Sequence, residues 1–72
     1  MEFKIGDIVT PTYSDMELVK GRNYIIENIL NEDNNYFLRL RCMETENLLI
    51  YAYHSRRLVL AKKTIKQVLE EL

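Results

Sequence analysis

The side chains best suited to chemistry in this 72-residue chain are aromatic rings and arginines that lie close together in its middle part. We expect them on one exposed face of two neighbouring strands, where the set comprises Phe37, Arg39, Arg41, Leu49, Tyr51 and Tyr53. Aromatic rings stack on bases and guanidinium groups pair with phosphates, which suits nucleic acid. The same residue types are enriched in protein interfaces and their hot spots. The set therefore predicts a binding surface for a protein or a nucleic acid.

Two further groups are candidate binding surfaces of their own. One is a loose basic cluster, suited to phosphates or to an acidic protein, which comprises Arg56, Arg57, Lys62, Lys63 and Lys66. The other is the apolar part of a long first loop, which comprises Tyr13, Met16 and Leu18. Each has a simpler alternative, because short charge runs mostly keep a surface soluble and apolar loop residues can pack over the end of a domain.

No residues have the spacing of a catalytic or metal site. His54 is the single histidine and Cys42 the single cysteine, so the two form no recognisable ligand set. We expect His54 to make a backbone hydrogen bond in a turn and Cys42 to be a small core residue. The two glycines, Gly6 and Gly21, do not make a phosphate-binding loop. The sequence thus predicts a protein that is not an enzyme and that holds no cofactor and no metal.

Composition predicts one small globular domain, residues 1–72. Apolar residues make up 47% of the chain, which is ordinary for a folded globule. The longest apolar stretches fall far short of the about 20 residues that a membrane-spanning helix needs. The amino terminus lacks the apolar segment and cleavage site of a signal peptide. With a single cysteine and no export signal, we expect a cytoplasmic protein that does not bind membranes.

The net charge of −1 bears on the choice of partner. A dedicated nucleic-acid-binding protein usually has a clear basic excess, and this chain has none. Acidic residues dominate the first half of the chain and basic residues the second half. This asymmetry still allows a local basic patch, or docking in one orientation.

Five short strands must position these side chains, and the third has the clearest pattern. From Tyr36 to Cys42 the side chains alternate, so that even-numbered residues such as Leu38 and Leu40 share one apolar face. Such alternation is typical of a half-buried antiparallel strand. The full set of predicted strands covers residues 8–10, 23–30, 36–42, 48–53 and 58–61, with a bulge near 27–28 and a polar turn over 31–35.

The apolar pattern also predicts how the third and fourth strands pair. Register follows the hydrophobic pattern when one face of a sheet is buried. One apolar face results when the partners are Cys42 with Leu48, Leu40 with Ile50, and Leu38 with Ala52. This register turns Leu49, Tyr51 and Tyr53 outward and so creates the predicted surface.

The last ten residues predict a short α-helix over residues 63–72. Thr64 and Gln67 have the spacing of a capping box, and an apolar stripe follows at helical spacing, comprising Ile65, Val68, Leu69 and Leu72. So short a helix needs a surface to lie on. One alternative for the aromatic face is therefore that this helix covers part of it.

Three segments carry motifs of a known kind: Gly6-Asp7-Ile8-Val9, Val19-Lys20-Gly21-Arg22-Asn23-Tyr24-Ile25-Ile26, and Tyr36-Phe37-Leu38-Arg39-Leu40. They resemble a group of small SH3-like proteins encoded by phages and prophages. The resemblance implies a mainly β fold, an SH3-like five-stranded small barrel over residues 3–61 with a short C-terminal α-helix. It also implies a compact binding module, often an accessory or host-modulating protein. The chain has no Trp, so the resemblance does not extend to the proline-rich peptide groove of true SH3 domains.

The patterns predict a non-enzymatic protein-interaction module. With the resemblance added, we expect an accessory protein encoded by a phage or prophage that binds and modulates, or inhibits, a host protein in the host cytoplasm. Two alternatives stay open. The first is weak binding of nucleic acid through the tyrosines and four arginines, Arg39, Arg41, Arg56 and Arg57. The second is a homodimer formed through the same aromatic face.

Overall fold

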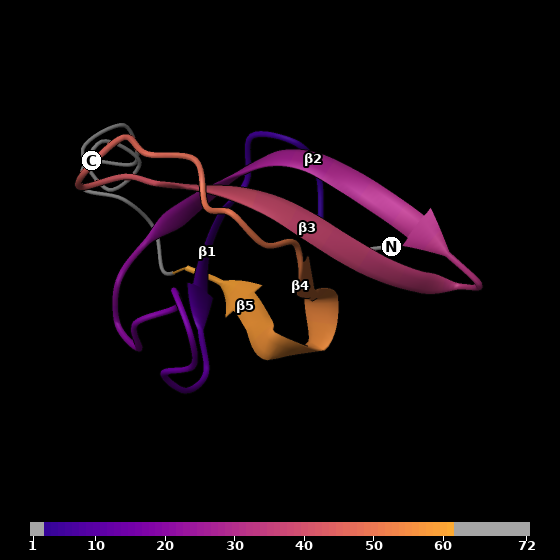
Figure 1. Ribbon diagram of the computed structural model, residues 1–72, viewed down its shortest axis with the longest axis horizontal. Coiled ribbons are helices and arrows are strands. Elements are labelled where there is room, and N and C mark those ends of the chain that lie inside the picture. The colour runs from indigo at the N-terminus through magenta and orange to yellow at the C-terminus, as the bar shows by residue number, and fades with distance from the viewer. Residues whose placement is uncertain (1–2, 62–72) are drawn as a thin grey trace, which may run out of the picture.

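A computed structural model describes residues 3–61 of the chain and shows a mainly β fold, as predicted (Figure 1). Five antiparallel strands form one sheet in the order β4-β3-β2-β1-β5. The elements are β1 (Ile8–Pro11), β2 (Tyr24–Glu32), β3 (Asn35–Cys42), β4 (Tyr53–His54), the 3-10 turn η1 (Ser55–Arg57) and β5 (Leu58–Leu60). No helix within the described residues is long and apolar enough to cross a membrane.

The long hairpin β2–β3 dominates the sheet (Figure 1). Its two-residue turn places Asp33 and Asn34 at φ 50° and 66°, a left-handed conformation that Asp and Asn tolerate better than most residues. The register shifts between Ile26 and Asn28, which confirms the predicted bulge at Glu27. Bulges bend a strand and increase its twist. Accordingly, β1 pairs with β2 only at Tyr24 and Ile25, before this bend.

The predicted alternation in β3 is confirmed. Leu38 and Leu40 have no exposed surface, Cys42 is buried, and the odd-numbered residues between them lie on the other face. The inward side chains meet one core cluster to which every strand contributes, comprising Phe3, Val9, Leu18, Tyr24, Ile26, Leu38, Leu40, Cys42, Leu49, Tyr53 and Leu58. Burying apolar surface in this cluster is the main force that holds so small a sheet in its curved shape.

The predicted register of the fourth strand is wrong. Leu38 lies opposite Tyr53, and Arg41 forms an isolated bridge with Leu48. The segment from Leu48 to Tyr53 is therefore two residues longer than the segment of β3 that it faces, from Leu38 to Arg41. The additional residues form a bend at Ile50–Tyr51, and only Tyr53–His54 remains a strand. As a consequence, Leu49 and Tyr53 lie in the core, although the predicted register had placed both side chains on the outer face.

The physical reason lies in the composition of residues 48–53. Every position there is apolar or aromatic, so shifting the strand by one residue buries nearly as much apolar surface. The hydrophobic pattern therefore did not distinguish the two registers. The bend has instead polar contacts to its backbone, from Glu17 in the first loop and from Arg39 in β3.

The sheet is not closed, so the described residues do not form the predicted barrel. β4 and β5 lie at its two edges and are linked through η1 without pairing to each other. The predicted C-terminal α-helix, residues 63–72, lies outside the described residues.

Candidate functional site

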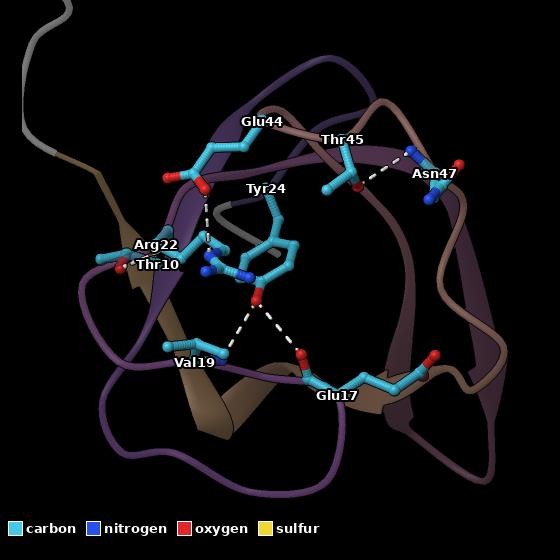
Figure 2. Close-up of polar contacts among 8 residues, drawn as sticks. All are labelled: Thr10, Glu17, Val19, Arg22, Tyr24, Glu44, Thr45 and Asn47. Carbon is cyan, nitrogen blue, oxygen red and sulfur yellow. Dashed lines mark hydrogen bonds and ion pairs between the residues drawn. The ribbon is translucent and has the colours of Figure 1, made fainter.

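The long first loop, residues 12–23, is fixed to the core by Tyr24. The Tyr24 hydroxyl accepts a hydrogen bond from the Val19 N–H at 3.0 Å and donates one to the Glu17 carbonyl at 3.2 Å (Figure 2). Leu18, between these two residues, is buried in the core. The buried Tyr24 side chain thus anchors the loop to the core and holds the backbone of Glu17 in place.

The far end of this loop is fixed to neighbouring segments. The Thr10 hydroxyl donates to the Arg22 carbonyl at 3.0 Å, and the Arg22 guanidinium pairs with Glu44 at 3.4 Å (Figure 2). Gly21, at φ 86°, supplies the positive φ of this turn at little steric cost. The middle and the far end of the loop are therefore held by contacts with other parts of the fold.

A tight reverse turn at the tip of the loop points the side chains of Met16 and Glu17 in different directions. Asp15 and Leu18 exchange backbone hydrogen bonds of 3.0 and 2.8 Å across this turn. Met16 adopts φ 52°, a strained conformation for a residue with a side chain. Met16 is exposed, whereas the Glu17 side chain reaches across to the chain before β4.

The Glu17 carboxylate accepts three hydrogen bonds from this distant segment. Oε1 accepts from the Ile50 N–H at 2.9 Å, and Oε2 accepts from the Tyr51 N–H at 3.1 Å and the Tyr53 hydroxyl at 3.0 Å. Two successive backbone N–H groups form a favourable site for an anion. Burial raises the pKa of Glu17, but these hydrogen bonds and the Arg39 charge outweigh it and leave that pKa below 4.5.

Tyr53 completes this contact from the core side. Its hydroxyl also accepts a hydrogen bond from the Glu17 N–H at 3.2 Å. Burial, together with the adjacent Glu17 carboxylate, raises the pKa of Tyr53 to about 12. The phenol therefore stays protonated at neutral pH and remains a hydrogen-bond donor to Glu17.

Arg39 holds the same segment from the other side. Its Nη1 donates to the Ile50 carbonyl at 3.1 Å. The backbone at Ile50 and Tyr51 is thus bound at its N–H groups by Glu17 and at a carbonyl by Arg39, and we call these two residues the clamped bend. The side chains of Ile50 and Tyr51 remain 73% and 51% exposed. The clamp therefore holds two large apolar side chains in water.

A pocket of about 480 Å³ lies beside the clamped bend, and we call it the aromatic pocket. It is lined by Met16, Asn35, Phe37, Tyr51, Ala52, Tyr53, His54, Arg56 and Arg57. The rings of Phe37 and His54 meet edge to face, with centroids 5.4 Å apart. This volume is within the usual range of ligand pockets, roughly 300–1,000 Å³.

His54 fixes the rim of the aromatic pocket. Its Nδ1 accepts a hydrogen bond from the Arg56 N–H at 3.1 Å and so caps η1, which confirms the backbone hydrogen bond predicted for this histidine. The other ring nitrogen, Nε2, lies 3.1 Å from Asn35 Oδ1 and donates to it. Both ring nitrogens are used within the fold, which orients the ring toward Phe37.

The two arginines of η1 have different surroundings. Arg57 pairs with Asp15, and its guanidinium lies 6.0 Å from the centre of the Tyr13 ring. Arg56 is exposed and makes no ion pair with any carboxylate of residues 3–61. Arg57 is therefore part of the contact between loop and η1, while the Arg56 charge is available at the rim.

The structure divides the predicted surface into three parts. Five of its residues line the aromatic pocket: Phe37, Tyr51, Tyr53, Arg56 and Arg57. Tyr13 lies next to them through Arg57, and Arg39 supports the clamped bend. The remaining two lie elsewhere, because Leu49 is a core residue and Arg41 is paired with Glu27 and bound to the Glu46 carbonyl.

Sequence reasoning missed Glu17, His54 and Asn35 as parts of this site. Glu17 lies in a loop 33 residues before Ile50, whose N–H donates to its carboxylate, and no local pattern marks an acidic loop residue as the partner of a distant backbone. His54 and Asn35 were expected in turns, and only the pairing of β3 with β4 brings them together.

Comparisons of the chain with protein-family models, with curated proteins and with solved structures found no match. Within residues 3–61 no group of three or more His, Cys, Asp or Glu residues is arranged to hold a metal ion. Cys42 is buried in the core, as predicted.

Proposed function

We propose that this chain is a non-enzymatic protein-interaction module that binds its partner through the clamped bend and the aromatic pocket. The observation that carries the proposal is the clamp itself. Glu17 and Arg39 bind the backbone of a bend whose side chains, Ile50 and Tyr51, are left in water. An exposed apolar pair on a fixed backbone loses little conformational entropy when it binds a partner.

The surroundings of the bend support the same proposal. Tyrosine and arginine are enriched among interface hot spots, and here Tyr51 and Arg56 flank one pocket. Met16, 67% exposed, extends the apolar surface on the loop side. Flexible methionine side chains adapt well to the shape of a protein partner.

The arginines support a protein partner over a nucleic acid. Binding along a phosphate backbone needs several uncommitted cations. Within the described residues, the side chains of Arg22, Arg41 and Arg57 are ion-paired and that of Arg39 binds a carbonyl. Of the five arginines in residues 3–61, this leaves Arg56 for phosphate contact. Weak binding of nucleic acid remains the alternative.

We further propose that the fold is related to the SH3-like small barrels, with its sheet left open between β4 and β5. Its support is the strand order β4-β3-β2-β1-β5, the long loop after β1 and the single 3-10 turn before β5. The resemblance of the three motif segments suggests a phage-encoded accessory protein and a host protein as the cytoplasmic partner. A homodimer through the clamped bend is the other protein partner to be tested.

Affinity capture with paired variants tests the proposed function. Wild-type protein, Tyr51→Ala and a control, Val59→Ala, are used as baits, because Val59 is similarly exposed on β5 outside the pocket. Any captured protein is purified and titrated by calorimetry. We expect stoichiometric binding to wild type and Val59→Ala, and at least a tenfold weaker affinity for Tyr51→Ala, which is about 1.4 kcal/mol.

Two results would contradict the binding of a separate partner protein through this surface. One is a partner that binds wild type and Tyr51→Ala equally well. The other is a sedimentation coefficient that rises with concentration for wild type but not for Tyr51→Ala, which would assign the surface to self-association.

A further inference from the structure

The charges around the aromatic pocket are unbalanced. Within the part of the chain that the structure describes, no Asp or Glu lines the pocket, while Arg56 and Arg57 do. Arg57 is neutralised by Asp15 on the adjacent loop. Among the pocket-lining residues, Arg56 is therefore the charged side chain that no carboxylate of residues 3–61 pairs with.

The fold also fixes where this charge is presented. Arg56 lies in η1, and its backbone N–H is bound by His54 Nδ1 at 3.1 Å. His54 is itself held by Asn35 and packs on Phe37, so the backbone of the turn is oriented by residues of the pocket wall. On this turn Arg56 becomes one of the residues that line the aromatic pocket.

We propose that the aromatic pocket binds a peptide segment that carries a carboxylate next to a large apolar side chain. The apolar side chain enters between Phe37 and Tyr51, and the carboxylate pairs with the Arg56 guanidinium. Arginine is suited to this role because its planar fork matches a carboxylate with two parallel hydrogen bonds. The inference rests on the proposed function and adds the chemistry of the partner.

Two sources supply such a carboxylate: an Asp or Glu side chain, or the carboxyl terminus of the partner. Both present the same planar group to Arg56. A phosphate would also pair with one arginine, but a nucleic acid needs a series of cations along its backbone, and the pocket offers one. The pocket therefore favours a peptide.

Selection from an unbiased random-peptide library tests this inference. The baits are wild type, Arg56→Gln, Tyr51→Ala and a matched control, Lys20→Gln, which removes a positive charge outside the pocket. Amide NMR spectra of each bait verify that its fold is retained. We expect wild type and Lys20→Gln to enrich peptides with an acidic residue or a free carboxyl terminus beside a large apolar residue.

Titration of an enriched peptide then measures the role of its carboxylate. We expect its affinity to fall about tenfold for Arg56→Gln, and by the same factor for wild type when the acidic residue is replaced by its amide. Amidation of the peptide's carboxyl terminus, as a separate arm, distinguishes the two sources. Lys20→Gln should bind like wild type.

The outcomes separate this inference from the proposed function. Enriched peptides that lack a carboxylate, or that bind Arg56→Gln as well as wild type, would overturn the inference and leave the interaction module standing. A library in which wild type and Tyr51→Ala enrich the same peptides would overturn both. Binding of a short oligothymidylate that depends on Arg56, without any enriched peptide, would assign the pocket to nucleic acid instead.

Discussion

Replacing Glu17 by Gln tests whether one carboxylate fixes the clamped bend. Gln keeps the size of the side chain but exchanges one oxygen for an NH₂ group. In either amide orientation that NH₂ faces at least one donor, because Oε1 accepts from Ile50 and Oε2 from Tyr51 and Tyr53. The substitution therefore removes at least one hydrogen bond and the negative charge that strengthens the others.

The expected loss in the free energy of unfolding is about 1.5 kcal/mol. A hydrogen bond contributes about 0.5–1.5 kcal/mol net, and the lower part of this range applies to the two bonds near solvent, where water can replace the lost partner. The third bond, to the Tyr53 hydroxyl, is partly buried and contributes more. For a domain of this size the loss lowers the midpoint of thermal unfolding by roughly 10 °C.

The assay is thermal and urea unfolding of Glu17→Gln against Glu32→Gln. Glu32 is exposed at the end of β2, so its variant makes the same change in charge without disturbing the clamp. Amide NMR spectra should show the largest shifts at Ile50 and Tyr51. Equal stability of the two variants, with unshifted Ile50 and Tyr51 amides, would refute the role given to the carboxylate.

The comparison of wild type with Glu17→Gln should also depend on pH. The folded-state pKa of Glu17 lies below its ordinary value of 4.5, so its ionised form is stabilised by folding. That stabilisation is fully present above pH 4.5 and is lost as the pH falls through the folded-state pKa. The difference in stability between wild type and Glu17→Gln should therefore shrink in acid, whereas a constant difference from neutral to strongly acidic pH would contradict this assignment.

Three further predictions concern Tyr53, Met16 and the core. The ultraviolet absorbance of tyrosinate should show one tyrosine titrating near pH 12. Tyr53→Phe should remove that step, and the contribution of Tyr53 to stability should be lost as the pH rises from about 10 toward that value. Met16→Gly should raise the free energy of unfolding by about 0.5–1 kcal/mol, because it relieves a φ of 52°, and should weaken partner binding, because it removes a pocket side chain. Leu38→Ala should cost about 3 kcal/mol in urea unfolding, while Leu30→Ala, 43% exposed, should cost less than about 1 kcal/mol.

Much of the sheet could be predicted because its signals are local. The alternation of β3, the bulge at Glu27 and the turn at Asp33–Asn34 each depend on neighbouring residues alone. In β3 the polar Arg39 and Arg41 lie between apolar residues, so one strand face is clearly the better one to bury. Local patterns of this kind determine which side chains point inward.

The candidate site could be predicted only in part, because its contacts are not local. Most of the aromatic and arginine residues singled out from their types do surround one pocket. The sequence pattern predicts that a regular strand register brings these residues together on one outer face. Instead, the apolar run 48–53 allows two registers, and the contacts of Glu17 favour a bend. Leu49 was placed outside for the same reason, since its exposure depends wholly on that register.

The clamp also bears on when a newly made chain can bind. Glu17 leaves the ribosome long before Ile50 and Tyr51, which follow 33 and 34 positions later in the sequence. A chain released early, at the end of β3 for example, would hold the acidic loop without the segment that it orients. Translation products that end before Tyr51 would therefore lack the surface that we propose for partner binding.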